Sequence, residues 1–196
     1  MPQLTHLQFE FNMEKFLNLV AYLCFKTNYL DPLKATKLLY LIDRRHLVRY
    51  GKPVLGDFYV KMDYGPVPSV AYGILRDSYS PLPGEEHANR DLFAEYIEVD
   101  KPFWRRYPRF KARKKPDLDV FSEAEVESID SVINEHGNKT GMELSRLTHD
   151  DATCEVSLNS LIDYRLFFKR CPEANEAALR LLELEQEDRD FVSCLR

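Results

Sequence analysis

The chain has 196 residues, of which 44% are hydrophobic, so it can bury a sizeable core. This length fits a single domain that spans residues 1–196 and carries a β-hairpin insertion at about 91–115. The formal net charge of −5 argues against general binding to nucleic-acid backbones, which requires a basic surface. No apolar run approaches the roughly 20 residues that span a bilayer, and the N-terminus has no secretory signal. We therefore expect a cytoplasmic protein without membrane contact.

The four cysteines give no sign of a metal site or a disulfide framework. No two of them form a CxxC pair, and none lies near a histidine at a zinc-finger spacing. The chain also lacks the P-loop, GxSxG and HExxH motifs of common enzyme classes. We therefore expect reduced thiols, no cofactor and no catalytic activity. The cysteines are Cys24, Cys154, Cys171 and Cys194.

Two helices are predicted near the N-terminus. The first covers about residues 12–28, where apolar side chains recur at helical spacing. The second begins after Asp31, which can cap it, and ends at Gly51, which can adopt the left-handed conformation. Its segment Leu38–Ile42 is apolar on every face, so we expect it to be the most buried part of the protein. The next turn, Asp43–His46, should return to solvent or contact a partner.

Short strands are predicted in the middle of the chain. Asp57–Asp63 is rich in β-branched and aromatic residues, and Gly65-Pro66 ends it before a helix that starts near Pro68. Phe93–Val99 and Arg109–Arg113 show strand-like alternation. They should form a hairpin that extends the same sheet.

The remainder of the chain is predicted to be helical. Capping boxes begin at Ser122 and Thr140, each ahead of an apolar helical pattern. Two further helices should cover about residues 159–169 and 172–190. Together the elements predict an α+β fold, with a mainly helical core and a small antiparallel β-sheet.

Three short blocks resemble one protein family. Residues 37–53 read KLLYLIDRRHLVRYGKP, Tyr64–Val67 read YGPV, and Leu144–His149 read LSRLTH. In this order, over about residues 12–150, they resemble the Panacea (SocA-like) antitoxin domain of type II toxin–antitoxin systems. Members of the family often have a tryptophan a few residues after the Thr-His pair, whereas this chain has DDATC at 150–154.

The resemblance implies a bacterial or phage protein that binds a cognate protein toxin and neutralises it by direct contact. Some relatives are described as adaptors that deliver a toxin to a protease, so this alternative stays open. The family is associated with many unrelated toxins. The shared blocks therefore do not identify the partner.

The resemblance and the residue types together suggest where a toxin is bound. Gly65 and Pro66 have a simpler interpretation as a turn between a strand and a helix, and His46 as a structural histidine. His149 is followed by two aspartates, but three consecutive residues do not place three metal ligands on one side of a helix. The candidate toxin-binding residues are Arg45, His46, Tyr64, Gly65, Pro66, Val67, Trp104, Arg105 and His149.

The segment 101–115 combines eight Lys or Arg residues with four aromatic residues and contains no Asp or Glu. Three interpretations are open: a solvated hairpin whose aromatic rings pack inward, a docking surface for an acidic protein, or a binding site for single-stranded nucleic acid. The acidic charge of the whole chain makes nucleic acid the less favoured partner. The acidic side of the last helix could also pair with this segment in a homodimer; it carries Glu183, Glu185, Glu187, Asp188 and Asp190.

Overall fold

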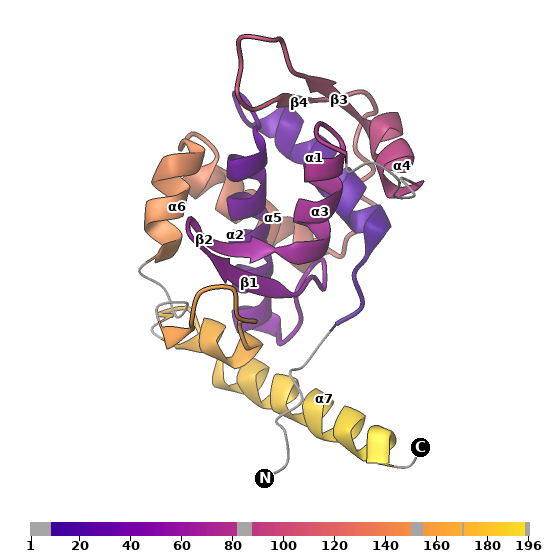
Figure 1. Cartoon of the computed structure of the whole chain (residues 1–196). Coiled ribbons are helices and arrows are strands. Elements are labelled where there is room, and N and C mark those ends of the chain that lie inside the picture. The colour runs from indigo at the N-terminus through magenta and orange to yellow at the C-terminus, as the bar shows by residue number, and fades with distance from the viewer. Residues whose placement is uncertain (1–8, 82–87, 150–154, 170, 195–196) are drawn as a thin grey trace.

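The computed structural model of the protein describes residues 9–81, 88–149, 155–169 and 171–194. Its fold is α+β and mainly helical, as the sequence predicts (Figure 1). Residues 150–154, where the chain departs from the family pattern, lie outside the described part. In chain order the elements are α1 (Met13–Lys26), α2 (Pro32–Tyr50), β1 (Tyr59–Met62), β2 (Gly65–Pro68), α3 (Ser69–Asp77), α4 (Ala88–Tyr96), β3 (Ile97–Asp100), β4 (Arg109–Ala112), α5 (Glu123–His136), α6 (Gly141–His149), the 3-10 helix η2 (Tyr164–Phe168) and α7 (Glu176–Cys194).

Helix α2 forms the centre of the molecule. Its boundaries follow the predicted signals: the Asp31 side chain accepts a hydrogen bond from the Lys34 N–H, and Gly51 ends the helix with a φ of +79°. Residues Leu38–Ile42 are shielded from solvent, which confirms that this segment lies deep in the core. Helices α3, α5, α6, α7 and η2 and strand β2 all contact α2.

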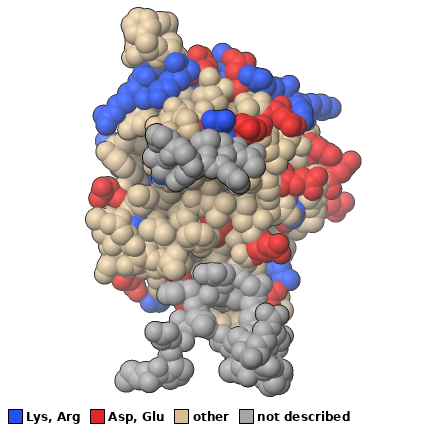
Figure 2. Space-filling model, turned by 45° about the vertical axis from the view of Figure 1, so that its right-hand side comes forward, with Lys and Arg blue, Asp and Glu red and all other residues tan. Residues whose placement is uncertain are grey.

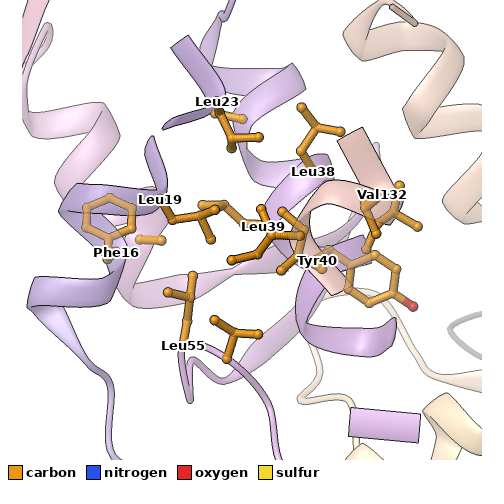
Figure 3. Close-up of a cluster of buried hydrophobic side chains, with 14 of the residues drawn as sticks. Phe16, Leu19, Leu23, Leu38, Leu39, Tyr40, Leu55 and Val132 are labelled. Atoms are coloured by element: carbon orange, nitrogen blue, oxygen red, sulfur yellow. The ribbon is translucent and has the colours of Figure 1, made fainter. Parts of the chain in front are cut away.

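Side chains from distant parts of the chain meet around α2 in one hydrophobic core (Figure 3). Leu19 of α1, Leu39 and Tyr40 of α2 and Val132 of α5 all belong to this core. Burying a side chain of this size stabilises the folded state by about 1.5–3 kcal/mol. The core is therefore the main source of stability, and it fixes the positions of the surface loops.

The strands form two separate hairpins, so the prediction of one extended sheet is wrong. β1 pairs with β2, with Val60 opposite Val67, and β3 pairs with β4, with Val99 opposite Phe110. The second hairpin instead pairs with the chain just before the N-terminus of α2. The Phe110 N–H donates a hydrogen bond of 2.8 Å to the carbonyl oxygen of Leu30.

The predicted strand Phe93–Val99 is wrong over most of its length, because residues up to Tyr96 belong to helix α4. Phe93 and Ile97 are both buried. A spacing of four residues places two side chains on the same face of a helix and also on the same face of a strand, so the sequence pattern fits both. The Phe93 ring stacks on Phe16 at 6.0 Å and meets Phe110 edge-on at 5.8 Å. These tertiary contacts outweigh the local alternation that favours a strand.

Two more sequence predictions are corrected in this structure. Gly65 and Pro66 do not end a strand before a helix, because they lie inside strand β2. The segment 159–169 is helical only from Tyr164 to Phe168, since Asn159 adopts a φ of +62° and Leu161 bridges to Val60. Position 161 thus extends the edge of the β1–β2 hairpin.

The predicted capping boxes are confirmed. The Ser122 N–H donates to Glu125 at 2.8 Å and the Glu125 N–H donates back to the Ser122 hydroxyl, and Thr140 and Glu143 repeat this reciprocal pair. Within the described ranges, no helix has both the length and the apolar character needed to cross a membrane.

The buried position of Leu39 allows a test of the core. We expect Leu39→Ala to lower the free energy of unfolding by about 3 kcal/mol, because it removes contacts of a fully buried side chain and leaves a cavity. The matched control is Leu184→Ala on α7, whose side chain is 49% exposed and which should cost less than about 0.5 kcal/mol. Urea unfolding followed by circular dichroism measures both values; equal losses would contradict the assigned core.

Candidate functional site

The three sequence blocks that carry the family resemblance meet at one junction. Strand β2 passes between α2 and α6 at Gly65, which has a φ of +92°. A Cβ atom at this position would lie 3.2 Å from the Thr148 hydroxyl and 3.3 Å from the Lys37 Nζ. Glycine is required here both for its backbone conformation and for the close approach of its neighbours.

Lys37 is the central side chain of this junction, and sequence reasoning did not select it as a site residue. It is fully buried, and its Nζ donates a hydrogen bond of 2.6 Å to the carbonyl oxygen of Pro66. Burial disfavours the charged ammonium and lowers the pKa of Lys37 to about 7. Because Lys37 is inaccessible, its contribution is to hold the β1–β2 hairpin against α2.

Helix α6 holds the other side of the same hairpin. The Ser145 hydroxyl donates to the carbonyl oxygen of Tyr64 at 2.9 Å, and the His149 Nε2 lies 2.9 Å from the carbonyl oxygen of Asp63. The hairpin turn is therefore fixed from two helices. Tyr64 itself is 55% exposed.

Asp43 does not return to solvent as predicted, because two donors satisfy it in the interior. The Leu55 N–H and the Tyr59 hydroxyl donate to its carboxylate at 2.8 Å and 2.9 Å. Burial raises the pKa of Asp43 to about 7. Asp57, close to it in the chain, accepts hydrogen bonds from the Val70 and Ala71 N–H groups at the start of α3, and burial raises its pKa to about 6.

Arg45 faces the protein interior more than the sequence predicts, whereas the burial of His46 agrees with its interpretation as a structural histidine. The Arg45 side chain is only 10% exposed and forms a bidentate ion pair with Glu135 at 2.6 Å and 2.7 Å. It lines a pocket of about 300 Å³ between α2, α5, α6 and the segment 171–173. His46 is buried, with its Nδ1 3.1 Å from the Ser128 hydroxyl, and burial lowers its pKa.

The loop between β3 and β4, unlike the region of Arg45 and His46, exposes large side chains to solvent. Phe103 is 96% exposed, Trp104 72% and Tyr107 51%, so three of the four aromatic side chains of segment 101–115 face solvent. Phe110 alone is buried. The interpretation of this segment as a hairpin whose rings all pack inward is therefore wrong.

The basic side chains of this hairpin also face outward. In β4, Phe110 points into the core while Arg109 and Lys111 on either side of it are exposed, as the alternation of a strand requires. Lys111 pairs with Glu98 and Asp100 of β3 at 3.7 Å and 3.3 Å. Figure 2 shows Lys and Arg side chains gathered over this end of the molecule.

The structure thus divides the candidate residues among three places. The hairpin junction brings together Tyr64–Val67 and His149, the α2–α5 pocket contains Arg45 with His46 near it, and the exposed β3–β4 loop contains Trp104 and Arg105. Gly65, Pro66, Val67 and His46 are buried in this conformation. Phe103 and Tyr107 were not selected from the sequence, although they flank Trp104 in a run of basic residues that signals an exposed loop.

Comparison with known families identifies the domain. Residues 36–154 match the family model described as antitoxin SocA-like, Panacea domain. The matched segment covers more than half of the chain and contains all three resembling blocks, so the chain belongs to this family. No curated protein and no solved structure matches the chain.

The buried amine of Lys37 makes stability depend on pH above neutrality. Between pH 7 and about 10.5, the unfolded chain binds a proton at this position that the folded protein does not, so stability should rise with pH. Relative to Lys37→Met, wild-type stability should therefore increase by a few kcal/mol across this window, at about 1.4 kcal/mol per pKa unit. Chemical denaturation of both proteins at pH 7 and pH 10 measures the difference. Parallel pH curves would show that Lys37 is not desolvated.

The carboxyl group of Asp43 makes stability depend on pH in the opposite direction to Lys37. Its folded pKa lies above the unfolded value of 3.8, so the folded protein binds the extra proton, and this contribution to stability is lost as the pH rises from 4 to 7. Asn at this position keeps an acceptor for the Leu55 N–H and does not titrate. We expect wild type to lose stability relative to Asp43→Asn between pH 4 and pH 7, as measured by thermal unfolding. A constant difference would contradict the assigned pKa.

Proposed function

We propose that this protein is a cytoplasmic antitoxin that binds a cognate protein toxin and suppresses it by direct contact, without catalysis. The observation that carries the proposal is membership of the antitoxin SocA-like, Panacea domain family. The family name gives the toxin as the partner class, and the fold supplies a rigid core with exposed side chains at its surface.

The accessible candidate residues define where such contact is feasible. Tyr64 and Trp104 are both exposed and aromatic, and Arg105 and His149 are partly exposed. Tyr, Trp and Arg are the side chains most often found as anchors of protein interfaces. The buried Gly65, Pro66 and Val67 belong to strand β2 and keep the Tyr64 turn in place, whereas the buried His46 contacts Ser128 of α5 instead.

The proposed mechanism is sequestration, in which the antitoxin covers the surface that the toxin needs for its activity. An interface of about 1,600 Å² in total is enough for tight and specific association. Because the hairpin turn is fixed by Lys37, Ser145 and His149, little backbone ordering is needed on binding. Low ordering cost favours the affinity that neutralisation requires.

The proposal is tested with the open reading frame adjacent to this gene. We expect its product to arrest growth when it is expressed alone, and co-expression with this protein to restore growth and give a stoichiometric complex on size-exclusion chromatography. A stable complex is expected because, in the proposed mechanism, the toxin is suppressed only while this protein contacts it. A neighbouring product that is harmless, or that never associates with this protein, would refute the proposal.

The same cells separate sequestration from delivery to a protease. Under sequestration, the half-life of the toxin after translation is stopped should be unchanged or longer when this protein is present. A toxin half-life that shortens, and recovers when the protease is deleted, would instead show an adaptor.

A further inference from the structure

The tip of the β3–β4 loop presents two aromatic rings that the fold itself does not use. Phe103 and Trp104 contact each other edge-on, with centroids 5.0 Å apart, and both are largely exposed. Large adjacent apolar side chains that remain in water are costly, and such patches on a folded domain mark interaction sites. The pair is therefore available to enter a partner.

An arginine-lined hollow of about 280 Å³ adjoins this tip. It is lined by Asp31, Arg105, Arg106, Tyr107, Pro108 and Arg109. The Nη1 of Arg105 is shielded from solvent and makes no hydrogen bond with a described residue, since its ion-pair partner, the Asp100 carboxylate, lies 3.9 Å away. A shielded donor without an acceptor is unfavourable unless a ligand supplies one.

The other two arginines of the hollow, Arg106 and Arg109, are exposed and can donate hydrogen bonds to a ligand. The Arg106 guanidinium lies over the Tyr107 ring at 5.4 Å and that of Arg109 over the Tyr29 ring at 5.2 Å, and neither forms an ion pair within the part of the chain that the structure describes. Stacking on the rings holds their forked donors in place. Such forks match the two oxygens of a carboxylate or a phosphate.

We propose that the β3–β4 loop docks on an acidic surface of the protein toxin, with a toxin carboxylate in the arginine-lined hollow and Phe103 and Trp104 in an apolar socket beside it. This inference rests on the proposed function and names the surface and the chemistry of its partner. Figure 2 shows a projection of residues other than Lys, Arg, Asp and Glu above Lys and Arg side chains at the β3–β4 end.

Two observations favour a protein over a nucleic acid. The Phe103 and Trp104 rings are nearly perpendicular, at 84°, so they do not offer parallel faces on which successive bases stack. The basic residues of β4 are also interleaved with carboxylates, since Lys111 pairs with Glu98 and Asp100. These carboxylates repel a phosphate backbone. The hollow itself is lined by one carboxylate, Asp31, and by three arginines, so it keeps an excess of positive charge for a single acidic side chain.

Isothermal titration of the adjacent toxin tests the two halves of the surface separately. We expect Arg105→Glu with Arg106→Glu, and Phe103→Ala with Trp104→Ala, each to weaken binding about 30-fold or more. Matched controls are Arg180→Glu and Phe25→Ala, which change an exposed arginine on α7 and a 61% exposed phenylalanine on α1 and should leave the dissociation constant within about threefold. If the charge-reversed pair unfolds, Arg105→Gln with Arg106→Gln replaces it.

Trp104 is the only tryptophan of the chain, so its fluorescence reports directly on the loop. Its emission should shift to shorter wavelength when a tryptophan-free variant of the toxin binds, because the ring leaves water. An unshifted emission in a saturated complex, or loop variants that bind as tightly as wild type, would overturn the docking surface while the proposed function stands. If wild type itself neither binds nor neutralises the toxin, both proposals fail.

A single-stranded thymidine dodecamer tests whether the loop binds nucleic acid instead of a protein. We expect no shift of Trp104 emission at physiological salt. Saturable binding of the dodecamer that the Arg105→Glu, Arg106→Glu protein loses would assign the hollow to phosphate and overturn the inference.

Discussion

The burial of the central part of α2, residues 34–43, on all of its faces is the constraint on which the rest of the structure depends. A helix buried on every face needs neighbours on every face, and here α5, α6, α7 and the β1–β2 hairpin supply them. The helix also carries Lys37 and Asp43 into the interior, where an unpaired polar group would cost several kcal/mol. The partners of these two groups, the Pro66 carbonyl and the Tyr59 hydroxyl, belong to the same hairpin. The need to hydrogen-bond the buried polar groups of Lys37 and Asp43 therefore determines where that hairpin lies.

This arrangement explains what the three family blocks have in common. Each block contributes to the junction at Gly65: Lys37 from the first, the β2 residues from the second, and Thr148 with His149 from the third. They specify a scaffold, and most of their side chains are buried. A shared scaffold of this kind leaves exposed segments such as the β3–β4 loop free to differ, and the proposed function would assign the choice of partner to them.

The β3–β4 loop is well suited to that task because its position is fixed while its tip is free. The buried Phe110 anchors it in the core, and the Phe110 N–H donates to the Leu30 carbonyl oxygen just before α2, whereas Phe103 and Trp104 are largely exposed. Changes at the tip are therefore expected to have little effect on folding. The Tyr64 turn, held by two helices, offers a second exposed aromatic on the same scaffold.

The sequence alone determined the features that depend on neighbouring residues. Helix ends at Asp31, Gly51 and Ser122 follow from caps that act within one turn, and the mainly helical α+β class follows from periodicity. Only the tertiary structure decided the rest: Phe93 joined a helix because Phe16 and Phe110 surround it, and Asp43 turned inward because Leu55 and Tyr59 offer donors. It likewise decided which aromatic of segment 101–115 is buried, since only Phe110 reaches a core built by distant residues. Local patterns record what a residue prefers, whereas burial depends on partners that the chain brings together only when it folds.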